Sequence, residues 1–222
     1  MKCARLKKNL TFLIIAVLGV LAVLFGVVLF NSHLLSSFTL PLRMILVIVT
    51  QWLLFLVPGI LMLVNKEKFK DLGFTKKKLL KQILLGLGIA AAMSAVLTVL
   101  PVLLGAGGWI GSTNYTQAWQ FAYEFIFAIF GVALAEELIF RGYIFHKLLD
   151  IKNSRWFAVI VSSALFGLFH IFTGLSLQIL TTAIIGVFYC LCREKIKDCT
   201  ILSLIIAHGV YDALIVLWVG IL

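Results

Sequence analysis

The most restrictive feature of the sequence is a series of apolar stretches, each long enough, or nearly so, to cross a bilayer as a helix. About 20 apolar residues are needed to cover the ~30 Å hydrocarbon core. Hydrophobic residues make up 63% of the 222 residues and charged residues only 13%, which excludes a soluble globule, a disordered chain and a collagen-like fibre. The seven stretches lie at roughly 10–30, 40–64, 79–105, 119–148, 156–173, 175–192 and 200–222.

The apolar stretches are uniform, whereas a membrane β-barrel would show segments of ~10 residues that alternate in polarity. We therefore predict an all-α fold, a polytopic transmembrane helix bundle of about seven spanning helices. The chain forms one transmembrane domain, 1–222, with N-terminal apolar helices in 1–118 and a second part, 119–222, that is richer in charged residues within its helices. A break is expected near Thr173-Gly174.

Basic residues are distributed unevenly between the apolar stretches. All but two of the 19 Lys and Arg residues precede the first stretch or lie near the junctions after the second, fourth and sixth, and the exceptions are Arg43 and Arg141. Cytoplasmic loops are enriched in Lys and Arg. The pattern predicts a multi-pass protein of the cell membrane with a cytoplasmic N-terminus. The net charge of +10 then reflects topology, with the lipid bilayer as a partner and no nucleic acid.

Several ionisable residues nevertheless lie inside the later apolar stretches. An ionised group near the bilayer centre costs roughly 2.5–3.5 kcal/mol on insertion scales, so such groups usually face a protein interior and serve a function. These residues are the most informative in the chain. They are Glu124, which we place at the outer interface, and Glu136, Glu137, Arg141, His170, His208 and Asp212.

The first cluster is Glu136-Glu137-Leu-Ile-Phe-Arg141. Adjacent positions on a helix are about 100° apart, so the two carboxylates point in different directions. Glu137 and Arg141 are four residues apart with the acid first, which favours an ion pair. Glu136 is then left without a local partner. A desolvated carboxylate with no cation beside it binds a proton more tightly than one in water, which suits a general base.

Two further clusters each hold two residues that are four positions apart and share one helix face. They are Phe166…His170 in the fifth stretch and His208…Asp212 in the seventh. Together with Glu136, they offer a base, two imidazoles and an acid, which can activate water and stabilise an oxyanion. The zinc-protease motif H-E-x-x-H is absent from the sequence. Alternatively, Asp212 only orients His208, and the charged groups only hold helices together.

Two expectations concern how these clusters are packed. Gly167 and Gly209 lie inside the clusters and should allow neighbouring helices to approach closely. Centring each stretch in the bilayer places Glu136 and His170 roughly 12 Å apart in depth, at ~1.5 Å per residue. A shared site therefore requires that one of the two helices is shifted or tilted.

The three clusters, in this order, resemble the motifs E-E-x-x-x-R, F-x-x-x-H and H-x-x-x-N/D of the CAAX-protease and bacteriocin-processing (Abi) family of intramembrane proteases. The Ras-converting prenyl endopeptidases belong to this family. The resemblance covers about residues 119–222, which would form the catalytic core. The matching residues are Glu136, Glu137, Arg141, Phe166, His170, His208 and Asp212.

The resemblance implies a role for each cluster. Glu136, helped by His170, would activate the attacking water, and His208 with Asp212 would bind the scissile carbonyl or its oxyanion. The remaining motif residues would give structural support: Glu137, Arg141 and Phe166.

The cofactor is left open by the sequence. The family is labelled a metalloprotease, and a metal-free glutamate mechanism is also proposed for it. Zn²⁺ catalysis would need three protein ligands plus water. The candidate ligands are His170, His208 and Glu136.

The leading hypothesis is an intramembrane endopeptidase that cleaves a membrane-anchored peptide or protein. One alternative is a non-catalytic immunity or scaffold protein, for instance in self-immunity to bacteriocins. Another is a small proton-coupled transporter, but transporters often show inverted repeats, and we find no repeat in this sequence.

Overall fold

The fold is seen in a computed structural model that describes residues 2–172 and 176–221. The predicted break at Thr173-Gly174 lies outside these residues. All seven apolar stretches are helical where they are described, and the described residues contain no strand. The predicted all-α fold is confirmed.

The N-terminal third forms two passes that pack side by side. A bend of 42° separates α2 from α3. Pro58 explains the bend, because proline has no N–H for the carbonyl of Leu54 and its ring crowds that carbonyl. These elements are α1 (Lys2–His33), the short turn η1 (Leu35–Ser37), α2 (Leu40–Leu53) and α3 (Leu56–Asn65).

The next pass is a helix that continues through a proline. Its middle segment is a wider π-helical turn. This turn accommodates Pro101, whose nitrogen has no hydrogen to donate to the preceding turn of the helix. The segments are α4 (Leu79–Ser94), η3 (Ala95–Val99) and α5 (Leu100–Leu103), preceded by the turn η2 (Phe69–Leu72) and followed by η4 (Gly107–Trp109).

Residues 118–151 form one uninterrupted helix with two π-helical turns. Such turns are frequent at functional sites, and here they lie on either side of the two glutamates. The segments are α6 (Ala118–Ile126), η5 (Phe127–Ala133), α7 (Leu134–Glu137), η6 (Leu138–Ile144) and α8 (Phe145–Ile151).

The C-terminal part supplies the remaining passes. The side chain of Ser154 caps the first of these helices by accepting a hydrogen bond from the backbone N–H of Phe157. The elements are α9 (Arg155–Phe169), the turn η7 (His170–Phe172), α10 (Ser176–Lys195) and α11 (Ile201–Ile221).

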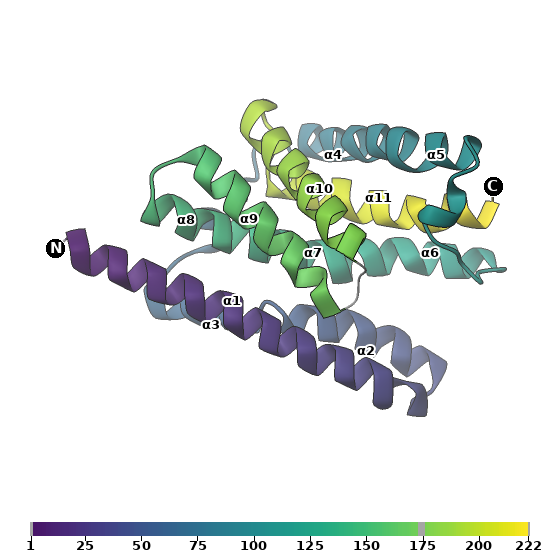
Figure 1. The fold of residues 1–222 in the computed structure, drawn as a ribbon, viewed down its shortest axis with the longest axis horizontal. Coiled ribbons are helices and arrows are strands. Elements are labelled where there is room, and N and C mark those ends of the chain that lie inside the picture. Colours follow the sequence, from purple (N-terminus) through teal and green to yellow (C-terminus); the bar gives the residue numbers. More distant parts are fainter. Residues whose placement is uncertain (1, 173–175, 222) are drawn as a thin grey trace.

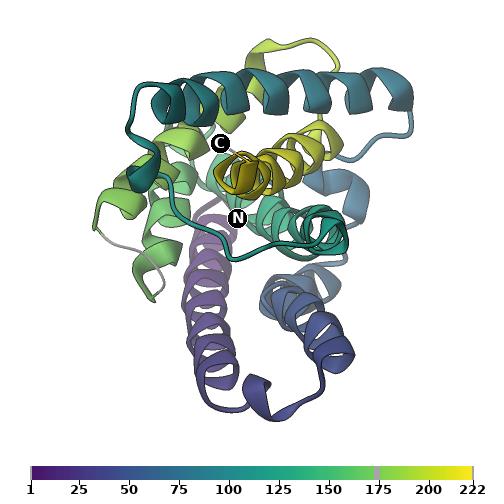
Figure 2. The same cartoon turned by 90° about the vertical axis from the view of Figure 1, so that its right-hand side faces the viewer.

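The helix α11 lies in the middle of the bundle. It packs along α4 on one side and against η5 and α6 on the other, while α9 pairs with α10 and α1 contacts α3 and α8 (Figure 2). The N- and C-termini lie at opposite ends of the long axis, and α9 and α10 run obliquely to α6 and α11 (Figure 1).

Among the residues that the structure describes, five helices are long and apolar enough to cross a membrane, and the bent pair α2–α3 makes six if it counts as one span. The five are Ala4–His33, Leu79–Leu103, Arg155–Phe172, Leu177–Lys195 and Ile201–Ile221. The stretch predicted at roughly 119–148 is helical but is not among them. The number of seven spans therefore stays a prediction.

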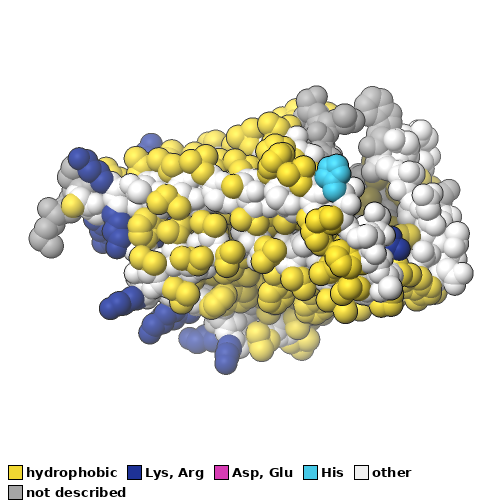
Figure 3. All heavy atoms as spheres, turned by 90° about the horizontal axis from the view of Figure 1, so that it is seen from below, with side chains coloured by type: hydrophobic (Ala, Val, Ile, Leu, Met, Phe, Trp, Pro, Cys, Tyr) yellow, Lys and Arg dark blue, Asp and Glu magenta, His cyan; other side chains and the backbone are white. Residues whose placement is uncertain are grey.

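The surface of the bundle differs from that of a soluble protein. Large apolar side chains are exposed along the helices, as the face over α1 to α3 shows (Figure 3). The interior is largely apolar but also holds charged side chains, including Glu137 at 0% exposed and Arg141 and Lys147 at 1% each. Such a distribution fits a lipid environment, since a soluble chain rarely exposes large contiguous apolar areas.

Lys and Arg side chains gather at the end of the bundle that holds the N-terminus (Figure 3). Asp198 joins two loops at this end by accepting hydrogen bonds from Lys78 and Lys81. The clustering agrees with the predicted separation of basic loops on one side of the membrane. Which side is cytoplasmic stays a prediction.

Glycines allow the central helices to touch. A Cβ atom at Gly209 would lie 2.5 Å from the Cα of Ile129, and one at Gly167 would lie 2.5 Å from the carbonyl oxygen of Ile179. The close approach that the sequence predicts at both glycines is thus present in the structure. Gly86 does the same for α4, since its Cβ would lie 2.7 Å from the carbonyl oxygen of Ser203 on α11.

The substitutions Gly86→Ala and Gly88→Ala test this packing with a matched pair on one helix. A Cβ at Gly88 meets no atom within 4 Å, so this variant should keep or slightly raise stability. Gly86→Ala has to push α4 from α11 and should lose about 1–3 kcal/mol, as overpacked cores do. Thermal unfolding of both variants in detergent measures the difference, and equal midpoints would contradict the close packing of α4 on α11.

Candidate active site

A cavity of about 670 Å³ lies between the helices of the C-terminal half. Its walls come from α10 and α11, from the α4–α5 pass, from the 118–151 helix and from the end of α9. Five of the predicted site residues line it together: Glu136, Phe166, His170, His208 and Asp212. The three clusters, which are far apart in the sequence, therefore meet at one place.

Glu137 lies behind the cavity wall and links two helices. It is fully buried, and its Oε1 accepts hydrogen bonds from Nη1 of Arg141 and Nδ1 of His208, both at 2.9 Å. The predicted pairing of Glu137 with Arg141 is confirmed. The bond to His208 was not predicted, because nothing in the spacing reveals which helix of a bundle faces Glu137.

Phe166 separates the charged pair from the cavity. The guanidinium carbon of Arg141 lies 4.0 Å from the centroid of its ring, a cation–π contact. The same ring meets His170 and His208 edge-on, with centroid distances of 5.2 and 6.0 Å. One aromatic side chain thus packs against both imidazoles. This contact explains why a phenylalanine accompanies the histidines in the sequence motif.

Glu136 points into the cavity rather than toward Arg141. It is 5% exposed, and its Oε2 has no hydrogen-bond partner among the described residues. The nearest ring nitrogen of His208, Nε2, lies 3.8 Å from that oxygen, which is beyond hydrogen-bond distance. Glu136 and Glu137 therefore diverge as adjacent helix positions should, and a carboxylate is left free to contact a ligand.

His208 is oriented from both sides. Its Nδ1 faces Glu137, and its Nε2 lies 3.3 Å from Oδ2 of Asp212, one turn further along α11. Since a carboxylate only accepts, Nδ1 donates its proton to Glu137. The Asp212 side chain is 34% exposed, so this end of the pair faces the open part of the cavity.

His170 stands where α9 ends and the turn η7 begins. Its Nδ1 lies 3.0 Å from the carbonyl oxygen of Phe166. A carbonyl accepts, so Nδ1 carries the proton and Nε2 is left with a lone pair in the neutral ring. The Nε2 of His170 can therefore accept a hydrogen bond from a ligand in the cavity.

The expected depth difference between Glu136 and His170 does not keep them apart, because both line the same cavity. The helix α9 crosses the bundle obliquely, as Figure 1 shows, so each of its residues advances less than ~1.5 Å along the long axis. In addition, the 118–151 helix extends past the predicted end at 148.

Sequence reasoning missed several residues that line the cavity. Tyr189 is fully buried, and its ring centroid lies 5.5 Å from that of His208. Three polar residues of α10, at the other end of the cavity wall, also contribute: Gln178, Thr181 and Thr182. Neutral polar residues inside an apolar stretch carry little signal, because they cost little in a membrane helix and often pack structurally.

A metal site needs several ligand side chains that converge on one point. Within 2–172 and 176–221, no three His, Cys, Asp or Glu side chains are arranged to hold one ion. As placed, Glu136, His170 and His208 therefore do not form the ligand set that Zn²⁺ needs. The binding of Zn²⁺ stays a prediction.

The arrangement has the parts needed for hydrolysis of an acyl bond. Glu136 and the Nε2 of His170 are two acceptors for a water molecule. His208, when protonated, offers an Nε2–H donor for a developing oxyanion. Apolar side chains enclose these groups, and a low local dielectric strengthens each charged contact.

The segment that holds the three motifs matches a known protein family. Residues 118–214 match the family described as type II CAAX prenyl endopeptidase Rce1-like. This match confirms the predicted family. It covers the 118–151 helix, α9, α10 and most of α11, which are the elements that hold all three motifs. No curated protein and no solved structure matches the chain significantly.

The Rce1-like match implies protease activity in general terms. Together with the apolar helices, it indicates a membrane protein whose residues 118–214 are similar to a protease family that acts on peptides or proteins. The family match does not say which residues catalyse the reaction, so the assigned roles stay predictions.

The substitutions Glu136→Gln and Glu137→Gln should have opposite effects on stability although they are neighbours. Glu137→Gln leaves the buried Arg141 without a counter-charge and should cost about 3–5 kcal/mol. Glu136→Gln removes a buried carboxylate without a hydrogen bond at Oε2 and should leave stability unchanged or higher. Thermal unfolding in detergent measures both. Equal losses would show that Glu136 also holds the helices together.

Proposed function

We propose that the protein is an intramembrane endopeptidase that hydrolyses a peptide bond in a membrane-anchored peptide or protein. Glu136 activates the water with the help of His170, and His208 with Asp212 stabilises the oxyanion. The proposed location is the cell membrane, in multi-pass form.

The observation that carries this proposal is the contrast between the two neighbouring glutamates. Arg141 and His208 occupy one oxygen of Glu137, whereas Glu136 faces the cavity with Oε2 unpartnered among the described residues. A buried carboxylate without a partner is destabilising, so its retention is best explained by a function. A base beside two imidazoles in a cavity fits that function.

In the first step, a water molecule lies between Glu136 and the Nε2 of His170. Glu136 takes one proton as the water oxygen bonds to the scissile carbonyl carbon, and the carbonyl π electrons move to its oxygen. The Nε2–H of protonated His208 donates to the resulting oxyanion. Asp212 and Glu137 favour the protonated form of His208, because each places a carboxylate beside one ring nitrogen.

In the second step, the tetrahedral intermediate collapses. The oxyanion electrons re-form the carbonyl, the C–N bond breaks, and Glu136 returns its proton to the leaving amine. The products are a carboxylic acid and an amine, and Glu136 is again ionised. One group serves as base and then as acid, which requires that its proton is not lost to bulk water and that no neighbouring cation weakens it as a base.

Glu137 and Arg141 act behind the cavity wall. Glu137 fixes the orientation of the His208 ring, in the way that carboxylates orient metal-bound or catalytic imidazoles. Arg141 balances the charge of Glu137 and holds the ring of Phe166. Neither the immunity alternative nor the transporter alternative gains a supporting observation from this arrangement.

The test is a comparison of wild type, Glu136→Gln and Glu124→Gln in detergent. Each protein is incubated with a pool of membrane-anchored peptides, and products are read by mass spectrometry. Loss of a general base should lower the cleavage rate by about 10²–10⁴-fold in Glu136→Gln. Glu124 lies on the same helix but does not line the cavity, and it accepts a hydrogen bond from Tyr115, so Glu124→Gln should cleave like wild type.

A parallel incubation with a strong chelator addresses the metal. If activity is lost and Zn²⁺ restores it, the reaction uses Zn²⁺, and the activation of water by Glu136 without a metal is wrong. Unchanged activity would support the glutamate mechanism. Cleavage by Glu136→Gln at the wild-type rate would remove Glu136 from the chemistry.

A further inference from the structure

Tyr189 carries a buried hydroxyl group that takes no part in the two proposed steps. The side chain belongs to α10, is 0% exposed and lines the cavity. Its Oη has no hydrogen-bond partner within residues 2–172 and 176–221. A buried polar group without a partner costs free energy, and a phenylalanine would fill the same space without that cost. Packing therefore explains the ring of Tyr189 but not its hydroxyl.

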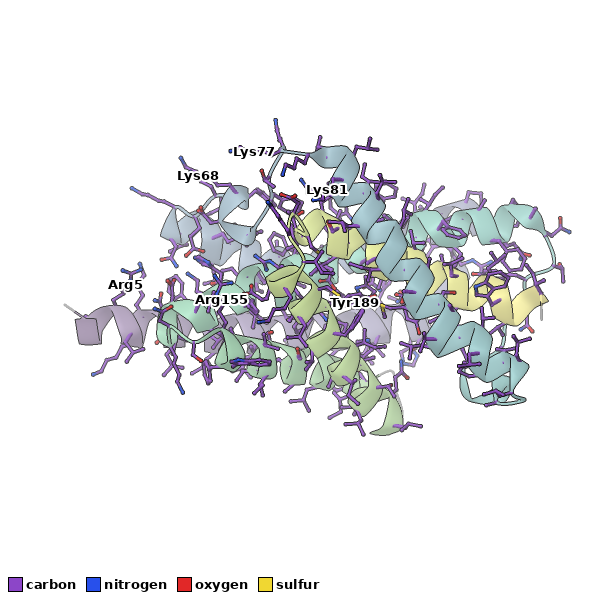
Figure 4. The ribbon with its side chains drawn as sticks, turned by 90° about the horizontal axis from the view of Figure 1, so that it is seen from above. Arg5, Lys68, Lys77, Lys81, Arg155 and Tyr189 are labelled. Atoms are coloured by element: carbon purple, nitrogen blue, oxygen red, sulfur yellow. The ribbon has the colours of Figure 1, made fainter. Side chains whose placement is uncertain are left out.

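The side chain of Tyr189 stands beside the His208–Asp212 pair, near the centre of the bundle in Figure 4. The centroids of the Tyr189 and His208 rings are 5.5 Å apart, and the ring planes are inclined by only 32°. The guanidinium carbon of Arg141 lies 5.5 Å from the centroid of the Tyr189 ring. Of the charged side chains, Asp212 acts most strongly on the Tyr189 hydroxyl. The hydroxyl thus belongs to the same polar cluster as Asp212 and His208.

The proposed first step changes the hydrogen bonds that are available to Asp212. In the free protein, the Nε2 of His208 lies 3.3 Å from Oδ2 of Asp212, and Nδ1 donates to Glu137. The protonated ring has only one hydrogen at Nε2. When this hydrogen is donated to the oxyanion, Asp212 loses its donor just as a second negative charge forms nearby. Like charges repel more strongly in an apolar site than in water, so the Asp212 carboxylate then needs another donor.

We infer that the hydroxyl of Tyr189 is this donor, and that it binds Asp212 while His208 donates to the oxyanion. Tyr189 is then a positioning residue, because it acts through Asp212 and does not touch the reacting atoms. This inference rests on the proposed function. It explains why Oη has no partner in the free protein, since His208 occupies Asp212 there. The Asp212 side chain is 34% exposed, which leaves it room to turn toward Tyr189.

The substitution Tyr189→Phe removes the hydroxyl and keeps the ring that packs against His208. The bond to Asp212 forms only while the oxyanion is present, so kcat should fall and KM should stay unchanged. A hydrogen bond to a charged group corresponds to a fall in kcat of roughly 10- to 150-fold. Both constants are measured in detergent with the membrane-anchored peptide that wild type cleaves fastest in the pool.

Tyr143→Phe is the matched control. Tyr143 is also buried, at 1% exposed, and its Oη is likewise without a partner among the described residues, but it does not line the cavity. This variant should cleave like wild type. The thermal midpoints of both variants should stay unchanged or rise, because an unpartnered hydroxyl is removed. A lower midpoint for Tyr189→Phe alone would show that its hydroxyl already has a structural partner, and the inference would be wrong.

A double variant shows whether Tyr189 acts through Asp212. Asp212→Ala removes the acceptor, so adding Tyr189→Phe to it should lower kcat further by less than about twofold. Additive losses would give the hydroxyl another acceptor and overturn the inference.

The outcome for wild type separates the two proposals. If wild type and Tyr189→Phe cleave at the same rate, the inference fails and the proposed protease stands. If wild type cleaves no peptide while it remains folded, the proposed function fails, and the role of Tyr189 in that reaction falls with it.

Discussion

The buried carboxylate of Glu137 is the interaction on which the site depends. Its Oε1 binds Arg141 on its own helix and His208 on α11, so one atom fixes both the spacing of two helices and the orientation of an imidazole. Because this oxygen is occupied by two donors, Glu136 is left as the carboxylate that faces the cavity. In an apolar interior, two charges that compensate each other hold their geometry, since separation would leave each of them desolvated.

Close packing, rather than hydrophobic collapse, holds the helices around this site together. Lipid is as apolar as the side chains that face it, so burying those side chains gains little. Gly86 and Gly209 bring α4 and the 118–151 helix against α11, and small residues at such contacts let dispersion forces act over a large area. The exposed apolar side chains contribute to insertion, whereas these contacts determine which helix faces which. The position of His208 opposite Glu137 therefore follows from glycines as much as from charges.

Much of this could be read from the sequence, and the remainder could not for definable reasons. The helical period placed Arg141 beside Glu137 and turned Glu136 away, and both features are present because they depend on a single helix. The bond from His208 to Glu137 joins residues 71 positions apart, and no local rule encodes such a pairing. The depth estimate for His170 assumed helices along the membrane normal, whereas the oblique course of α9 is set by packing. The place of Tyr189 in the cavity wall could not be predicted, because an aromatic residue in an apolar stretch looks like any other packing residue.

Three carboxylates in this chain illustrate how a functional group differs from a structural one. Glu67 pairs with Lys147, and Glu137 pairs with Arg141, so each negative charge has a cation within contact. Glu136 is buried as well, yet no Lys or Arg of the described residues pairs with it, and the Nε2 of His208 lies 3.8 Å from its Oε2. A helix bundle that needed only stability would gain by replacing it with an apolar residue. An ionisable group at such a position in a membrane protein indicates a function. Glu136 lies in a cavity beside two imidazoles, where it can accept a proton from a bound water molecule.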